Sequence, residues 1–133
     1  MAEPTIPKMV KNPRILTVGM DKGHTVMAND EKRFGANHEY EIVAKASKEG
    51  EPKRFFHQLI TFQCGPIQEV GRNGIHNEDL IAIVIDRLRD FQKTEFVCRE
   101  NALAITKLEE ALLWLNERTR GRMLRGVEGT HEQ

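Results

Sequence analysis

Hydrophobic positions follow two different periods along this chain, and the change falls near residues 71–74. Before it, polar and apolar residues alternate in short runs such as HEYEIV at 38–43, which is the pattern of a half-buried strand. Turn-forming residues such as KEGEP at 48–52 separate these runs. The sequence therefore predicts an antiparallel meander of short strands. The expected strands are 15–18, 25–27, 38–43, 55–62 and 67–70.

After residue 74 the apolar positions recur at helical spacing. Asn77 is a good N-cap residue, and Glu78 and Asp79 follow in the first turn, where the helix dipole favours acidic side chains. The helix that begins there is apolar on more than one side, so more than one neighbour is needed to bury it. A second subunit is the natural additional neighbour. The apolar residues of this helix are Leu80, Ile81, Ile83, Val84, Ile85 and Leu88.

A second helix is expected from about residue 98 to about residue 120. Gly121 and Gly126 mark its exit, although residues 122–124 are compatible with another helical turn. A short loop around residues 93–95 joins the two helices, which predicts an antiparallel helical hairpin. The apolar residues of the second helix form one stripe, made of Ala104, Leu108, Ala111, Leu112 and Leu115.

These elements predict an α+β fold: an N-terminal antiparallel β-sheet followed by a C-terminal antiparallel two-helix hairpin that mediates oligomerisation. The chain has 133 residues, of which 39% are hydrophobic and 30% charged, as expected of a globular protein. We expect an N-terminal arm at 1–13, a β-rich subdomain at 14–72 and the helical hairpin at 73–133. A dimer is the smallest assembly in which a second subunit could bury the remaining apolar side of the first helix.

The charge balance and the cysteines narrow the possible partners. Lys and Arg total 20 and so do Asp and Glu, which argues against a protein that coats DNA or RNA polymers through excess positive charge. No segment is apolar enough for a membrane span, and the first 13 residues lack the apolar core of a signal peptide. Cys64 and Cys98 lack the spacing of a zinc site, so no bound metal is expected. The two cysteines form a disulfide or, on the simpler interpretation, are reduced thiols of a cytosolic protein.

The sequence contains none of the common catalytic motifs. The five histidines lie in no metal-binding pattern, and neither a nucleophile elbow, a P-loop nor a dinucleotide-binding glycine motif is present. GRNG at 71–74 superficially suggests a phosphate loop but lacks the Lys-Ser/Thr ending, so it is interpreted as a turn before a helix. We therefore expect a protein that is not an enzyme and needs no cofactor.

Four side chains are candidates for ligand binding. Arg118 and Arg122 lie one helical turn apart, so their guanidinium groups suit a diphosphate, or they are surface arginines that complement the end of the helix. Phe91 either closes the core of the hairpin or stacks a base. The side chain of Asn101 either caps the second helix, is exposed to solvent, or binds the edge of an adenine.

The C-terminal half resembles a domain found in phage proteins that counter bacterial immunity. The strings NGIHNEDLIAIVIDRL at 73–88 and CRENALAITKLEEALLWLNERTRGRMLRGVEGT at 98–130 are similar to the hairpin domain shared by two families, Thoeris anti-defence protein one and the second anti-CBASS protein. The strand-rich half, which ends in FQCGPIQEVGRNG at 62–74, resembles the longer Thoeris family.

This resemblance implies a sponge in the host bacterial cytoplasm that binds cyclic nucleotide signalling molecules without cleaving them. In the Thoeris family the ligand is glycocyclic ADP-ribose, and Phe91, Asn101, Arg118 and Arg122 stand at the matching positions of this chain. Members also bind cyclic di- and trinucleotides at separate positions, and they form hexamers.

Spacing along the second helix supports a pocket between two subunits. Asn101 and Arg118 are 17 residues apart, which is roughly 25 Å on one helix, too far for one small ligand in a single subunit. A two-fold dimer with antiparallel helices would bring the arginines of one chain to Phe91 and Asn101 of the other and form two equal pockets.

The C-terminal tail has two interpretations. Its glycines would let backbone N–H groups approach a phosphate, so Arg125, Gly126 and Thr130 are candidates for a second, cyclic-oligonucleotide site. The tail would otherwise be a clasp on the oligomer. For the protein as a whole, the alternative to the sponge is an oligomeric helical-hairpin module that binds a host protein and no nucleotide.

Overall fold

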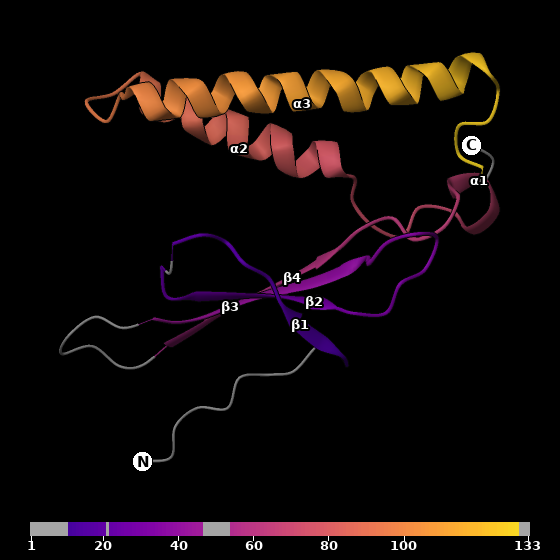
Figure 1. Ribbon diagram of the computed structural model, residues 1–133, viewed down its shortest axis with the longest axis horizontal. Helices are drawn as coiled ribbons and strands as arrows, with labels where there is room; N and C mark the ends of the chain where they lie inside the picture. The colour runs from indigo at the N-terminus through magenta and orange to yellow at the C-terminus, as the bar shows by residue number, and fades with distance from the viewer. Residues whose placement is uncertain (1–10, 21, 47–53, 131–133) are drawn as a thin grey trace. The chain divides into compact units, whose positions relative to one another are not determined.

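The computed structural model describes residues 11–20, 22–46 and 54–130. The chain divides into two compact units, Met1–Gly65 and Pro66–Gln133, which are considered separately below (Figure 1). The first contains strands and the second contains helices, so the predicted α+β fold is confirmed. The expected arm at 1–13 lies mostly outside the described residues, and its last residue, Pro13, begins the first strand.

The first unit is a four-stranded antiparallel sheet in the sequential order of a meander, as predicted. Each hairpin brings strands together that are neighbours in the sequence, so the alternation of side chains carries from one strand to the next. The first strand begins two residues earlier and is shorter than expected, whereas β2 and β3 end two and three residues later than expected. The strands are β1 (Pro13–Ile15), β2 (His24–Asn29), β3 (Glu39–Ala46) and β4 (Arg54–Thr61).

Side chains are buried on both faces of the sheet. One face buries Ala28 and Ala44 and carries Tyr40, whose ring meets that of Phe62 edge-to-face at 5.6 Å between centroids. The other face buries Glu41, which is 1% exposed, and its Oε1 lies 3.1 Å from Nε2 of His57 on β4. Glu41 is thus buried beside the imidazole of the neighbouring strand.

The connection from β2 to β3 is held by polar side chains. Asn37 donates to Oδ1 of Asp30 at 3.1 Å, and Arg14 on β1 approaches the same carboxylate oxygen at 3.3 Å. The pKa of Asp30 is lowered, first because the Asn37 amide hydrogen-bonds to its ionised form and second because of the hydrogen bond from Arg14. A two-residue turn of Phe34 and Gly35, both with positive φ, closes between Arg33 and Ala36.

The second unit contains α1 (Ile67–Val70), α2 (Asn77–Gln92) and α3 (Arg99–Leu124). The predicted strand at 67–70 is wrong, since these residues form the short helix α1. Pro66 supplies the fixed φ of a helix start, and Gly71 ends the turn at φ 76° with its N–H bonded to the carbonyl of Ile67. Pro66 and Gly71, which flank the segment, therefore determine its structure. Four residues are too few to show the spacing of hydrophobic positions that distinguishes a helix from a strand.

The starts and ends of the two long helices also differ from expectation. His76, not Asn77, is the N-cap of α2, and its backbone N–H donates to Oδ2 of Asp79 at 2.8 Å. Helix α3 runs through Gly121 to Leu124 and ends before Gly126, which has a φ of 74°. The extra turn places residue 122 firmly within the helix.

Helices α2 and α3 pack as the predicted antiparallel hairpin, and α3 continues past the start of α2 (Figure 1). Ile85 is buried, and the predicted stripe of α3 is half-buried along its length. Arg89 and Glu109 join the helices by an ion pair of 3.4 Å. Ile83 and Val84, on another side of α2, remain 62% and 44% exposed, which agrees with the prediction that one hairpin partner cannot cover this helix.

Within the described ranges, none of the helices combines the length and the apolar character that a bilayer-spanning helix requires.

Candidate ligand-binding site

The closed end of the hairpin presents an aromatic ring beside a cation. Phe91 lies in the last turn of α2 and is half-buried. Cζ of Arg87, one turn earlier, lies 5.1 Å from the centroid of the Phe91 ring, and the ring of Phe96 meets it edge-to-face with centroids 6.4 Å apart. One face of Phe91 is therefore covered by Arg87.

Asn101 lies at the start of α3, close in sequence to the same hairpin end. Its backbone N–H donates to Sγ of Cys98, the N-cap residue, at 3.4 Å. Capping, one of the interpretations given above for Asn101, is thus the role of Cys98 and not of the Asn101 side chain. Among the described residues, none forms a hydrogen bond with the Asn101 side-chain amide. That amide is a donor and an acceptor available to a ligand.

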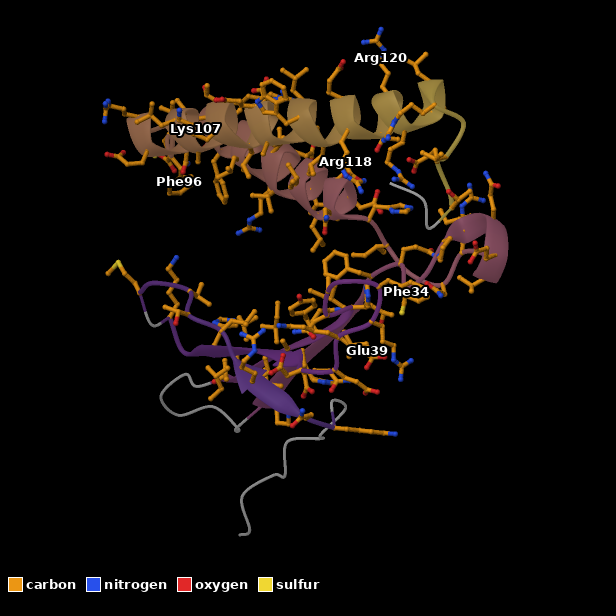
Figure 2. All side chains as sticks on the ribbon, turned by 45° about the vertical axis from the view of Figure 1, so that its right-hand side comes forward. Phe34, Glu39, Phe96, Lys107, Arg118 and Arg120 are labelled. Atoms are coloured by element: carbon orange, nitrogen blue, oxygen red, sulfur yellow. The ribbon has the colours of Figure 1, made fainter. Side chains whose placement is uncertain are left out.

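The opposite end of α3 carries the arginines. Arg118 is exposed and, among residues 11–20, 22–46 and 54–130, has no ion-pair partner. Arg120, also exposed, pairs with Glu117 at 3.0 Å. The two arginine side chains leave α3 on opposite sides, as Figure 2 shows, because two residues correspond to roughly 200° of helix. Arg118 points to the side on which α2 lies.

Arg122 is in a different state from Arg118, although both lie on one helix at a spacing of one turn. Its side chain is 10% exposed and its Nε donates to Oε2 of Glu128 at 3.1 Å. Its Nη2 donates to the backbone carbonyls of Val127 and Thr130, each at 3.0 Å. The guanidinium is thus the centre around which the C-terminal tail folds. Arg118 and Arg122 were expected to act as a pair, but in the single chain Arg118 is exposed and Arg122 is buried and hydrogen-bonded.

The tail after α3 is a folded turn. Gly126 takes a left-handed conformation directly after the helix, and Arg125 beside it is exposed. Gln68 on α1 donates from its side-chain amide to the carbonyl of Glu128 at 2.8 Å, and its backbone N–H donates to the carbonyl of Gly129 at 2.9 Å. Helix α1 and Arg122 therefore hold the tail from two sides, and the three candidates for a second site lie on or beside it.

One chain does not bring the four predicted ligand residues together. Because α3 is one uninterrupted helix, Arg118 and Arg122 lie about 25 Å and about 32 Å along it from Asn101. Phe91 and Asn101 lie at the hairpin end, and the two arginines lie at the far end of α3. We call these two groups of candidate residues the aromatic half-site and the arginine half-site. A ligand the size of a nucleotide contacts both only if a second chain supplies one of them.

Comparison with known proteins places this arrangement in a family. Residues 57–120 match the family described as "Acb2/Tad1, hairpin domain". A protein of Bacillus phage SBSphiJ7 named "Thoeris anti-defense 1" is 48% identical over a 130-residue alignment that covers 83% of this chain and 92% of the relative. This chain belongs to the Thoeris anti-defense 1 family.

Within the Thoeris anti-defense 1 family, the hairpin-domain match covers only part of the candidate site. It includes Phe91, Asn101 and Arg118, and it ends at residue 120, before Arg122 and the tail. The half-site at the hairpin end therefore lies wholly in the domain shared with the Acb2 proteins. The network around Arg122 lies in the part of the chain that follows it.

Several residues that build these two ends were not identified from the sequence. One of them is Gln92, whose side chain hydrogen-bonds to both backbone groups of Cys98. Glu128 and Gln68 hold the tail, and Arg87 covers the ring of Phe91. The spacing of Arg87 and Phe91, four residues on one helix, was a signal that could have identified that pair.

The described residues contain no group of three His, Cys, Asp or Glu side chains arranged to hold a metal ion.

Proposed function

We propose that this protein is a phage anti-defence sponge that binds glycocyclic ADP-ribose and withholds it, intact, from the bacterial immune system. Its membership of the Thoeris anti-defense 1 family supports the anti-defence role. The retention of Phe91, Asn101, Arg118 and Arg122 supports the ligand, because an aromatic ring, an amide and cations suit a base, a polar base edge and a pyrophosphate. The host bacterial cytoplasm is the compartment in which such a sponge would act.

The uninterrupted helix α3 is the observation that carries this proposal. It separates the aromatic half-site from the arginine half-site by about 25 Å, so that an antiparallel second chain would complete each half-site with the other. Such a dimer would also bury Ile83 and Val84, which one hairpin leaves exposed. A dimer is therefore the smallest functional unit proposed, and a hexamer would be an assembly of such dimers.

Within the pocket the two arginines take different roles. Arg118, exposed and without an ion-pair partner among the described residues, supplies the principal contact to the pyrophosphate. Arg122 acts from a fixed position, since Glu128 and two carbonyls already hold its guanidinium. Phe91 stacks the adenine on the ring face opposite Arg87, and Asn101 binds a base edge or a ribose hydroxyl.

The tail supplies a second proposed site, for cyclic di- or trinucleotides. Gly126 has positive φ and open space where a side chain would lie, which lets a ligand approach the tail closely at that point. The N–H groups of Gly126, Val127 and Thr130 already donate to carbonyls of the chain, so the contact to a phosphate is assigned to the Arg125 side chain. Arg125 is exposed beside Gly126, and Thr130 lies on the same turn. The tail of one subunit would form this site where subunits meet.

Sequestration without cleavage is tested by recovering the ligand. The protein is incubated with glycocyclic ADP-ribose and with a panel of cyclic oligonucleotides, and the free nucleotide is measured by chromatography before and after heat denaturation. The sponge removes the ligand from solution, and heating returns it unchanged. An altered product after heating would indicate a hydrolase, and a ligand that stays free throughout would reject nucleotide binding.

A mixing experiment tests the pocket between subunits. Phe91→Ala and Arg118→Ala chains are each expected to bind poorly, because every pocket in each homodimer lacks one half-site. Co-refolding them in equal amounts gives heterodimers in which one of the two pockets has both residues, so about a quarter of the wild-type binding capacity returns. If mixing restores nothing while heterodimers form, the pocket does not span two chains.

The alternative function is an oligomeric interaction module that binds a host protein and no nucleotide. It is favoured by Leu113 and Trp114 on α3, which are 61% and 63% exposed. The two functions differ in thermal shift: a ligand that binds only the folded protein raises its melting temperature. A nucleotide panel that leaves the melting temperature unchanged supports the interaction module.

A further inference from the structure

Gln92, the last residue of α2, makes two hydrogen bonds to a single residue across the hairpin loop. Its Oε1 accepts the backbone N–H of Cys98 at 3.0 Å, and its Nε2 donates to the backbone carbonyl of Cys98 at 2.9 Å. Gln92 and Cys98 are both half-buried. We call this pair of hydrogen bonds the Gln92 clamp.

The clamp fixes the point from which α3 starts. Cys98 is the N-cap of α3 with an extended backbone, and its Sγ accepts the N–H of Asn101. The side-chain amide of Gln92 can accept and donate in one plane, which matches the two backbone groups of Cys98. Holding this backbone therefore holds the first turn of α3, including Asn101.

The other hydrogen bonds of the loop act locally. The N–H groups of Lys93 and Thr94 bond to carbonyls in the last turn of α2, and that of Val97 bonds to the carbonyl of Thr94. Within residues 11–20, 22–46 and 54–130, the hydrogen bonds that join the last turn of α2 to the N-cap of α3 are those of the Gln92 clamp. Phe91 directly precedes one end of the clamp, and Asn101 follows the other end by three residues.

We propose that Gln92 is a positioning residue of the ligand site: the clamp sets the separation of Phe91 and Asn101 and thereby selects a compact, ring-closed ligand. This inference rests on the proposed function. A half-site that is held rigid loses less conformational entropy on binding and tolerates fewer ligand shapes. Gln92 need not touch the ligand for either effect.

Two variants remove the clamp in different ways. Gln92→Glu keeps the size and the acceptor but loses the donor, and it places a carboxylate oxygen against the carbonyl of Cys98. Gln92→Ala removes both hydrogen bonds. Each is expected to weaken glycocyclic ADP-ribose binding by about tenfold, the effect of one to two net hydrogen bonds on a preorganised site. Glu95→Gln, an exposed change in the same loop, is the control and leaves the affinity unchanged.

Calorimetry with the full-length chain would measure the affinity for glycocyclic ADP-ribose and for linear ADP-ribose, with light scattering to measure the oligomer mass. We expect the ratio of the two affinities to fall in both Gln92 variants while the oligomer mass stays at the wild-type value, because a loosened half-site discriminates less between the shapes. Affinities equal to wild type, or equal proportional losses for both ligands, would overturn the role of Gln92 alone. A wild-type protein that binds no glycocyclic ADP-ribose would overturn the proposed function together with this inference.

Discussion

The two ends of α3, which we propose to contact one ligand, arrange their polar groups in opposite ways. At the hairpin end, a side-chain amide from α2 organises the backbone, Phe91 is half-buried, and the Asn101 side-chain amide has no hydrogen-bond partner among the described residues. At the arginine end, a candidate ligand residue is itself the organiser, since Arg122 holds the tail. A residue can thus be part of a site either by remaining open to the ligand or by building the surface that meets it.

This comparison predicts that removing Arg118 mainly lowers ligand affinity, whereas removing Arg122 mainly lowers stability. Arg118→Ala should weaken glycocyclic ADP-ribose binding by on the order of a hundredfold, because a charged contact to the pyrophosphate is lost. Its free energy of unfolding should change by no more than about 0.5 kcal/mol, as is usual for an exposed residue. Calorimetry and denaturant unfolding measure the two effects.

Arg120→Ala is the matched control for Arg118, with the same charge on the same helix but on the opposite side (Figure 2). It should leave ligand affinity within about twofold of wild type, since its partner is Glu117 and salt bridges of this kind contribute little. Equal losses in the two variants would show that α3 attracts the ligand through general charge and contains no specific contact at Arg118.

Arg122→Ala should act mainly on stability. It leaves two carbonyls and the Glu128 carboxylate without the donors that now satisfy them, which we expect to cost about 2–3 kcal/mol of unfolding free energy. Urea unfolding measures the loss, and Glu128→Gln, which keeps an acceptor for Nε of Arg122, should lose less than half as much. A fully stable Arg122→Ala protein would contradict the role of Arg122 in holding the tail.

Two glycines at the arginine end should respond to alanine with opposite signs. Gly126 has a φ of 74°, so Gly126→Ala is strained and should cost about 1 kcal/mol although nothing lies within 4 Å of the added Cβ. Gly121 lies inside α3, also with open space around its Cβ, and Gly121→Ala should stabilise by up to about 1 kcal/mol. Thermal unfolding of both variants tests whether α3 really ends between them.

The smallest effect is expected in the sheet, away from both ends. Asn37→Ala removes the main hydrogen bond that lowers the pKa of Asp30, so this pKa should rise towards its ordinary value, as measured by NMR titration. Because the folded-state pKa is below the unfolded one, the contribution of Asp30 to stability is present above the unfolded pKa and is lost as the pH falls through the folded pKa. In Asn37→Ala this acid-dependent loss becomes smaller, whereas an unchanged titration would contradict the role of Asn37.

The sequence predicted the parts of the molecule that depend on local pattern. Alternation identified the meander, and the stripe around Leu108 and Leu112 identified the buried side of α3, because these periods follow directly from strand and helix geometry. Residues 67–70 were assigned wrongly, since a four-residue segment is too short for a period and the flanking Pro66 and Gly71 determine its structure.

The candidate site was less predictable for a physical reason. The positions of Arg118 and Arg122 on one helix could be predicted, but their different environments could not. The partners of Arg122 lie five to eight residues further along, on a tail whose path is set by contacts with Gln68 on α1. The Gln92 clamp could not be predicted for the same kind of reason. Gln92 and Cys98 are only six residues apart, but their hydrogen bonds depend on the conformation of the loop between them.

The unbroken 26-residue span of α3 also limits how the ligand preference of such a protein can evolve. A one-residue insertion in its middle would advance Arg118 by only about 1.5 Å but rotate it by about 100° out of phase with Asn101. Seven extra residues would restore the phase but lengthen the interval by about 10 Å. Adaptation to a slightly larger or smaller signal is therefore expected to come from exchanging side chains at the two ends. Insertions in the helix cannot change the distance between the ends slightly without also rotating one end relative to the other.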